Sequence, residues 1–281
     1  MKLKTILLSL FLLLSTSVFA DNNENCLTSA DVENRDGLYY LTGQDNPFTG
    51  TSKCVYSDTG QIKSLTEIWD GKLEGKWTWW YEDGQIEFKG NYKDSKLGSE
   101  TKNTYYENGQ LKSERNYKDG KLDGKWTEWY ENGQKLSEKN YKDGKRDGKW
   151  IAWRKSGQKS FEANYKDGKP DGKRTVWNRS GQIQSEINYK DGKPDGKWTW
   201  WHENGQLNKE ENYVHGVKEG KWTEWHKNGQ KKSEVNYKNN FKEGIGTRWY
   251  ENGQVRVEEN YRNDKQEGKR AEWHENGQLK S

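Results

Sequence analysis

The sequence predicts an all-β protein, an elongated antiparallel β-hairpin ribbon of about nine units, each of about 24 residues. Three observations lead to this fold class. The chain repeats itself at a fixed period, each period holds two glycine-containing turns, and Trp and Tyr recur at constant places between the turns. Such self-similarity is typical of repeat proteins that are stabilised by contacts between neighbouring units.

The period is marked by a Gly-Gln dipeptide, and positions are counted here from its glycine, so that +8 lies eight residues after it. All spacings between these glycines are equal except one, which is longer by a single residue because segment 96–104 carries an insertion. The marker glycines are Gly60, Gly84, Gly109, Gly133, Gly157, Gly181, Gly205, Gly229, Gly253 and Gly277.

Each unit is predicted to be two strands joined by a turn, as in 125–130, 131–134 and 136–141. Asn-Gly between two such runs is a strong hairpin signal, and we expect a two-residue turn in which both residues have positive φ. The return connection, such as 143–148, is too short for a crossover helix. Consecutive strands are therefore expected to be antiparallel neighbours.

A two-residue turn sets the register and gives the ribbon two faces. The tyrosine face carries Tyr at +8 and often Trp at −7, and we expect it to be the main packing face. The tryptophan face carries Trp at −4 among Lys, Glu and Asn. A three-residue turn would instead bring both aromatic rows to one face. The −4 tryptophans are Trp129, Trp153, Trp177, Trp201, Trp225, Trp249 and Trp273.

Two interpretations of these seven tryptophans stay open. In the first, they form a half-exposed stripe that binds a partner, since large rings rimmed by polar groups are common at interfaces. In the second, lysine stems and the neighbouring repeats cover the rings, which then only stabilise the sheet.

Segment 1–20 predicts a signal peptide that is cleaved between Ala20 and Asp21. A positive start is followed by an apolar run and by small residues before the cleavage site. We expect a periplasmic or secreted protein with a capping segment at 21–46 and a repeat domain at 47–281. In an oxidising compartment, Cys26 and Cys54 are expected to form a disulfide bond.

Charge and side-chain chemistry point away from nucleic acid and from catalysis. Lys and Arg number 48 and Asp and Glu 44, finely interspersed, so no basic stripe suited to nucleic acid is formed. Three of the four histidines stand where other repeats have Tyr. His202 and His226 should lie about 10 Å apart, too far to share a metal. We expect no cofactor, no metal and no enzymatic activity.

The motifs Gly-Lys-Trp-Thr-x-Trp-Tyr-Glu-Asn-Gly-Gln and Asn-Tyr-Lys-Asp-Gly-Lys-x-Asp-Gly resemble the MORN repeat family, in its bacterial variant typified by the YwqK-type antitoxin proteins. The resemblance covers roughly residues 36–281, and segment 45–50 looks like the family's opening unit. It implies an interaction module, in some members an antitoxin or immunity partner.

Two function classes follow. The first is an exported protein-binding scaffold, with an antitoxin-like inhibitor as a special form. The second is a module that binds cell-wall glycan, because aromatic hairpin repeats also occur in wall-binding proteins. The resemblance to MORN repeats alone implies lipid headgroups as a further ligand of this class. Segment 279–281 ends inside a strand, which leaves an edge that can pair with another chain. We therefore expect weak end-to-end dimers through the C-terminal repeat.

Overall fold

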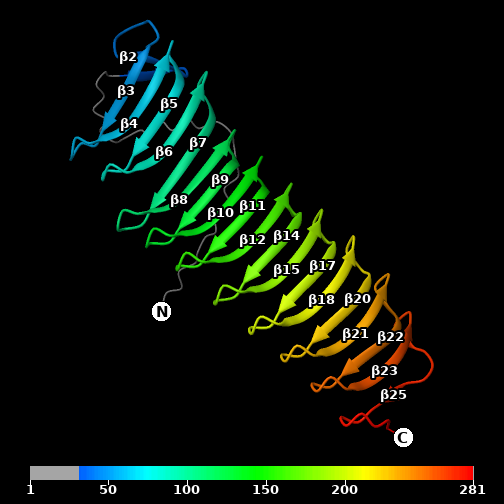
Figure 1. The fold of residues 1–281 in the computed structure, drawn as a ribbon. Coiled ribbons are helices and arrows are strands. Elements are labelled where there is room, and N and C mark those ends of the chain that lie inside the picture. The colour runs from blue at the N-terminus through cyan, green and yellow to red at the C-terminus, as the bar shows by residue number, and fades with distance from the viewer. Residues whose placement is uncertain (1–31, 281) are drawn as a thin grey trace, which may run out of the picture.

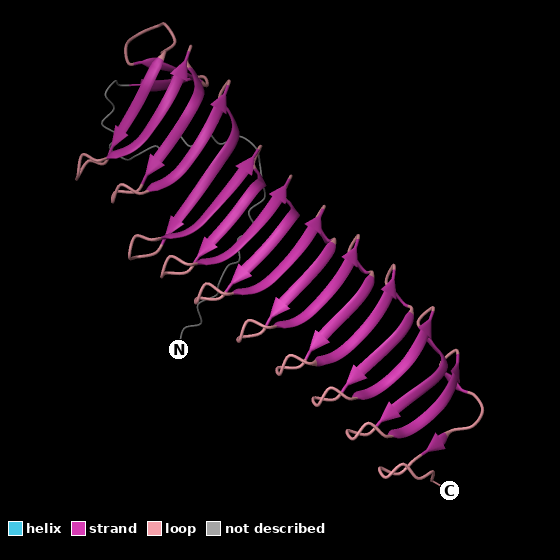
Figure 2. Ribbon diagram, in the orientation of Figure 1, coloured by secondary structure: helices cyan, strands magenta, loops and turns pink. Residues whose placement is uncertain are grey.

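The described part of the chain is one long ribbon of antiparallel strands. A computed structural model describes residues 32–280, and this range contains no helix. A sheet of 23 strands runs from β3 to β25 with consecutive strands as neighbours, and a separate two-stranded sheet stands at its N-terminal end (Figures 1 and 2). The predicted all-β hairpin ribbon is confirmed.

The strands follow one another along the ribbon axis, and each Gly-Gln turn joins two of them. Their bounds are β1 Val32–Arg35, β2 Leu38–Leu41, β3 Gly50–Val55, β4 Ile62–Trp69, β5 Lys72–Trp80, β6 Ile86–Lys93, β7 Lys96–Tyr105, β8 Leu111–Lys118, β9 Lys121–Trp129, β10 Lys135–Lys142, β11 Lys145–Trp153, β12 Lys159–Lys166, β13 Lys169–Pro170, β14 Gly172–Trp177, β15 Ile183–Lys190, β16 Lys193–Pro194, β17 Gly196–Trp201, β18 Leu207–Val214, β19 Val217–Lys218, β20 Gly220–Trp225, β21 Lys231–Lys238, β22 Phe241–Trp249, β23 Val255–Arg262, β24 Lys265–Gln266 and β25 Ala271–Glu272.

The small β1–β2 hairpin is fastened to the first long hairpin by backbone hydrogen bonds. Tyr39 N–H donates to Gly71 O at 2.8 Å, and Phe48 N–H donates to Tyr39 O at 2.8 Å. Cys54 is buried on β3, but Cys26 and the predicted signal peptide lie outside the described residues. The Cys26–Cys54 bond, the Ala20–Asp21 cleavage and the division at residue 46 therefore stay predictions.

The return turns are the two-residue turns of the ribbon. Asp143 and Gly144 have φ of 49° and 81°, and they connect the paired residues Lys142 and Lys145. Two successive positive φ angles match the right-handed twist of the flanking strands, which is why Asp-Gly suits this place.

The Gly-Gln turns differ, and the expectation of a two-residue Asn-Gly turn is wrong. Tyr130 N–H donates to Gln134 O at 2.8 Å, so three residues lie in the loop, and only Gly133 has positive φ, 79°. The cause is the side chain of Asn132, whose Oδ1 accepts a hydrogen bond from Gln134 N–H at 3.2 Å. This local bond replaces the strained backbone that a two-residue turn would require.

The predicted register and faces are nevertheless correct, because a β-bulge compensates for the longer loop. Trp129 pairs with Lys135, but Glu128 pairs with Ser137, so Leu136 has no opposed residue. The extra loop residue and the extra strand residue cancel. The reversal expected for a three-residue turn does not occur, and Trp126 faces Lys139 on the tyrosine face.

The core is thin and lies on both faces. Among the described residues no large side chain is fully buried. On the tyrosine face the buried positions include Ala163, Ile187 and Val257, whereas on the tryptophan face they are threonines such as Thr127 and Thr175. Small buried side chains between half-buried rings are what a single sheet without a covering layer can build.

Candidate functional site

A row of cross-repeat hydrogen bonds joins most hairpins to the next. The side chain at −3 donates to the backbone carbonyl of the −4 tryptophan one repeat further along; in the first turn, which is one residue longer, the donor is Tyr56 at −4. The pairs are Tyr56–Trp80 (2.8 Å), Tyr106–Trp129 (2.7 Å), Tyr130–Trp153 (2.9 Å), Arg154–Trp177 (2.8 Å), His202–Trp225 (3.0 Å), His226–Trp249 (3.2 Å) and Tyr250–Trp273 (2.9 Å).

Two of the histidines have a structural role in this row. Because a carbonyl oxygen only accepts, Nε2 of His202 and of His226 must carry the proton. The Tyr–His interchange was visible in the sequence, but the bond that it preserves was not. Within residues 32–280 no group of three His, Cys, Asp or Glu side chains could hold a metal ion.

The Gly-Gln turns are stacked by a second row of bonds. Asn132 Nδ2 donates to Lys155 O at 3.1 Å, across to the next turn, while its Oδ1 serves its own turn. The same pattern holds from Asn108, Asn204, Asn228 and Asn252. The turn asparagines therefore fasten the edge of the ribbon.

The seven predicted stripe tryptophans lie on the tryptophan face, and all are half-buried. A lysine of the preceding hairpin covers some of them: the Lys135 ammonium lies 5.8 Å from the Trp153 ring, and Lys231 lies 5.5 Å from Trp249. Whether this stripe binds a partner stays a prediction.

Ion pairs occupy the rest of the tryptophan face. Lys125 and Lys135 both contact Glu138, at 3.3 and 2.8 Å, and the hydrogen bond from Lys135 is the main cause that lowers the pKa of Glu138. Lys159 does the same for Glu162. Because the lysines are about half exposed, solvent screens these pairs and each stabilises the fold little.

On the tyrosine face the rings form a continuous ladder in the C-terminal half. Tyr189, Trp198, Tyr213, Trp222 and Tyr237 follow one another with ring centroids 5.4, 4.8, 5.4 and 4.6 Å apart. Each indole at −7 thus lies between two +8 tyrosines. Such tilted contacts each contribute about 0.5–1.5 kcal/mol beyond the area that they bury.

Cations lie over this ladder. The Lys218 ammonium is 4.5 Å from the Trp222 ring and 5.1 Å from the Tyr237 ring. Lys242, one repeat later, lies 5.0 Å from the Tyr261 ring. Among residues 32–280, neither lysine forms an ion pair through its ammonium group.

The ladder is interrupted at Gly246, which stands in the −7 column where other repeats have a ring or a long cation. The depression above it has a volume of about 280 Å³ and is lined by Trp222, Tyr237, Lys242 and Tyr261, among others. The sequence signal for this site is a glycine at −7, a position that holds tryptophan in most repeats. The motif that the repeats share does not reveal it. The −7 residues are Trp77, Lys102, Trp126, Trp150, Arg174, Trp198, Trp222, Gly246 and Arg270.

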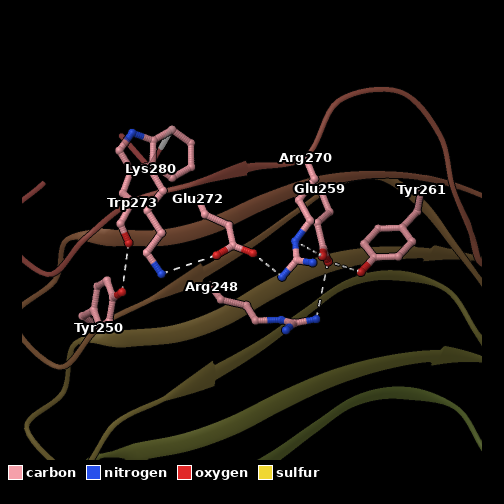
Figure 3. A network of polar contacts seen from close by, with 8 residues as sticks. All are labelled: Arg248, Tyr250, Glu259, Tyr261, Arg270, Glu272, Trp273 and Lys280. Atoms are coloured by element: carbon pink, nitrogen blue, oxygen red, sulfur yellow. Dashed lines mark hydrogen bonds and ion pairs between the residues drawn. The ribbon is translucent and has the colours of Figure 1, made fainter. Parts of the chain in front are cut away.

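A charge network, drawn in Figure 3, includes three residues that line this depression, Arg248, Glu259 and Tyr261. Glu259, which is 8% exposed, accepts a hydrogen bond from the Tyr261 hydroxyl and contacts Arg270 at 3.0 Å and Arg248 at 3.4 Å. The bond to Glu259 is the first cause that raises the pKa of Tyr261. With two guanidinium groups and a phenol on it, this carboxylate orients the walls of the depression.

A family model for the MORN repeat variant matches eight segments, which together make up more than half of the chain. The chain belongs to this family. MORN repeats suggest a repeat scaffold for binding, and the family is typically a non-enzymatic binding module. The matched segments are residues 73–94, 103–119, 122–143, 170–191, 194–215, 218–239, 242–263 and 266–281.

Other comparisons add little to the MORN assignment. No curated protein matches the chain. A solved structure titled "Crystal structure of GtfA/B complex bound to UDP and GlcNAc" is 13% identical with a TM-score of 0.18, over 44% of this chain and 25% of that one. The chain thus spans about a quarter of that structure's length, and no inference rests on the likeness. Within residues 32–280, the structure has no helix of the length and apolarity that a membrane crossing needs.

Proposed function

We propose that this MORN-repeat chain is an exported, non-enzymatic scaffold that binds a partner protein along its tyrosine face. The observation that carries the proposal is the aromatic ladder with two lysines above it, Lys218 and Lys242, whose ammonium groups form no ion pair with the described residues. Trp and Tyr are among the residues that dominate binding energy at protein interfaces, and an unpaired cation beside them can attract an acidic group of a partner. The ladder runs across several repeats, which suits an extended partner segment.

A wall glycan or a lipid headgroup is the alternative ligand. Stacking on sugars needs open ring faces, whereas the rings of this ladder pack against one another at centroid distances of 4.6 to 5.4 Å. With 48 basic and 44 acidic residues in the whole chain, the net charge gives an anionic membrane surface little to attract. Both observations favour a protein partner.

The more specific form of the proposal is an inhibitor like those of the YwqK-type antitoxin family, acting outside the cytoplasm on a toxin-like protein. The repeat motifs support it. A gene for a secreted toxin next to the gene for this chain would favour this form, and an isolated locus would count against it.

The test is capture of a partner from the native cell envelope by the mature chain, with variants that separate the faces. We expect a specific protein to be retained by the wild type, lost with Lys218→Glu and kept with Lys155→Glu, which changes an exposed turn lysine. Co-sedimentation with peptidoglycan and with anionic vesicles runs in parallel. Binding to either of these without any retained protein would replace the proposal by the alternative ligand.

A further inference from the structure

The interruption at Gly246 leaves a slot at a place where the preceding repeat has an indole. In the repeat before it, the Trp222 indole lies 5.4 Å from Tyr213 and 4.6 Å from Tyr237. At Gly246 the strand pairing continues unchanged, with Gly246 opposite Glu259. The place between the rings of Tyr237 and Tyr261 therefore has walls but no indole, and the 280 Å³ depression is found there.

The glycine is not required by the backbone. Gly246 is absent from the positive-φ residues of the chain, and its neighbours at −7 in other repeats carry large side chains. A Cβ atom at this position would meet Tyr261 Cε2 at 2.9 Å and Val235 Cγ2 at 3.4 Å. The Tyr261 ring thus leans onto the bare backbone, and it must move aside for a ring to enter at this position.

The slot keeps the groups that serve an indole elsewhere in the ladder. Lys218 caps Trp222 at 4.5 Å, and Lys242 occupies the equivalent place in the next repeat, beside Tyr261. A cation over a ring is attracted most strongly when the ring is an indole. Lys242 is therefore already placed for an indole that the chain does not supply.

A hydrogen-bond acceptor for the ring nitrogen is repeated as well. Trp198 Nε1 donates to Asn188 O at 2.8 Å, and Trp222 Nε1 donates to Asn212 O at 3.2 Å. Asn236 is the next residue in that +7 column, and it stands in the strand between Val235 and Tyr237, which both line the depression. A phenyl ring would fill the slot without using this acceptor, whereas an indole would use it.

We infer that the slot at Gly246 binds the indole of a tryptophan presented by a partner protein, flanked by acidic residues. The acidic flank follows from Lys242, which lines the slot and whose ammonium forms no ion pair with the described residues, whereas Arg248 is paired with Glu259. The inference rests on the proposed binding role and names one contact of that interface. The cation at Lys242 and the repeated backbone acceptor favour a tryptophan over other side chains.

The experiment is calorimetric titration of the mature chain with a short synthetic peptide that has one central Trp between Asp residues. We expect binding that weakens at least about tenfold in Gly246→Trp, which introduces the residue that most other repeats of this chain carry at −7 and fills the slot. Arg174→Trp, which restores the same residue three repeats earlier, should bind like the wild type. Peptides with Leu or with N1-methylated Trp in place of Trp should bind several-fold more weakly.

Lys242→Met provides a second variant that leaves the slot open and removes only the cation. It should weaken binding of the Trp peptide more than binding of the Leu peptide. No binding of the Trp peptide to the wild type at millimolar concentration overturns the inference. Equal binding by Gly246→Trp and wild type overturns it too.

The same variants used on the envelope extract separate this inference from the proposed function. If the peptide binds only the open slot but no envelope protein is retained, the slot stands and the scaffold role fails. If wild type and Gly246→Trp retain the same protein equally well, the scaffold role stands and the slot is overturned. Self-association of the wild type that is abolished by Trp69→Ala, a change at an exposed tryptophan, would assign the slot to a second copy, against a separate partner.

Discussion

The hydroxyl group of Tyr130 donates a hydrogen bond to the backbone carbonyl of Trp153, 2.9 Å away and one repeat further along the ribbon. Arg and His make the same bond from the same position elsewhere, so what the position requires is a donor of sufficient reach, not a phenol. The bond joins neighbouring hairpins at the end of the strands. It acts in addition to the backbone ladder between β10 and β11.

Removal of this donor should destabilise the ribbon by a measurable amount. Tyr130→Phe keeps the ring and loses the hydroxyl, so we expect the free energy of unfolding to fall by about 1 kcal/mol. Urea denaturation followed by tryptophan fluorescence measures it. Tyr165→Phe is the control, since no hydrogen bond joins the Tyr165 hydroxyl to any described residue, and it should change stability by a few tenths of a kcal/mol. Equal effects of both changes would contradict the role given to Tyr130.

Acid should weaken the fold through the glutamates of the tryptophan face. Hydrogen bonds from lysine hold the pKa of Glu138 and of Glu162 below the usual value of 4.5. A lowered pKa in the folded state means that the stabilisation is present above the unfolded pKa and is lost as the pH falls through the folded pKa. We therefore expect stability to decline below a pH of 4.5, and Glu138→Gln to show a smaller decline. Melting temperatures across this pH range test it, and an identical slope in the variant would count against the pair.

Alkali should weaken the fold through the tyrosine face. Burial raises the pKa of Tyr92 from 10.0 to about 12, and burial likewise raises the pKa of Tyr237. A raised pKa means that stability is fully present below the unfolded value of 10.0 and is lost as the pH rises towards the folded value. Spectrophotometric titration should show tyrosinate appearing late in the native protein and at pH 10.0 in urea. Tyr92→Phe should lose part of the late component.

Exchange of Trp and Gly should change the stability of the fold differently at position 222, inside the ladder, and at position 246, in its gap. Trp222→Gly removes an indole that contacts Tyr213 and Tyr237, and it should cost about 3–5 kcal/mol. Gly246→Trp fills a vacancy that the register already accommodates, so we expect unchanged or higher stability after Tyr261 moves aside. Thermal unfolding of both variants measures the difference. A large loss of stability in Gly246→Trp would show that the gap cannot hold a ring.

Iodide quenching should reveal one dominant exposed tryptophan. Trp69, at the end of β4, is 68% exposed, whereas the seven stripe tryptophans are half-buried. Trp69→Phe should therefore remove most of the readily quenched fluorescence. Strong quenching that survives this change would support an accessible stripe from Trp129 to Trp273, and protection of nearly all remaining rings would exclude it.

Much of the fold could be predicted because the same turn glycines and aromatic residues recur in each repeat. The two faces were correct even though the turn between them was not, since the bulge at Leu136 offsets the additional loop residue. The turn type failed for a physical reason. Asn-Gly favours a two-residue turn in general, but Asn132 uses both ends of its amide, one for its own turn and one for Lys155 in the next. That second partner exists only in the stacked array.

The candidate site was harder to predict, because it depends on a departure from the pattern. A period reveals what the repeats share, and a slot arises where one of them differs. Gly246 could have been noticed in the −7 column, but its meaning required knowledge of where Tyr237 and Tyr261 place their rings. The histidines are the opposite case. His202 and His226 differ from the tyrosine of other repeats in sequence, but they make the same hydrogen bond to a tryptophan carbonyl of the next repeat.

The bonds from Tyr130 and Asn132 reach only to the adjacent hairpin, and the strands of the long sheet follow one another in sequence order. A whole hairpin could therefore be deleted or duplicated without changing the contacts within the remaining hairpins. The length of the surface offered to a partner is then set by copy number, in steps of one repeat unit. Duplication of a hairpin before β21 would lengthen that surface while leaving unchanged the repeats that form the slot at Gly246.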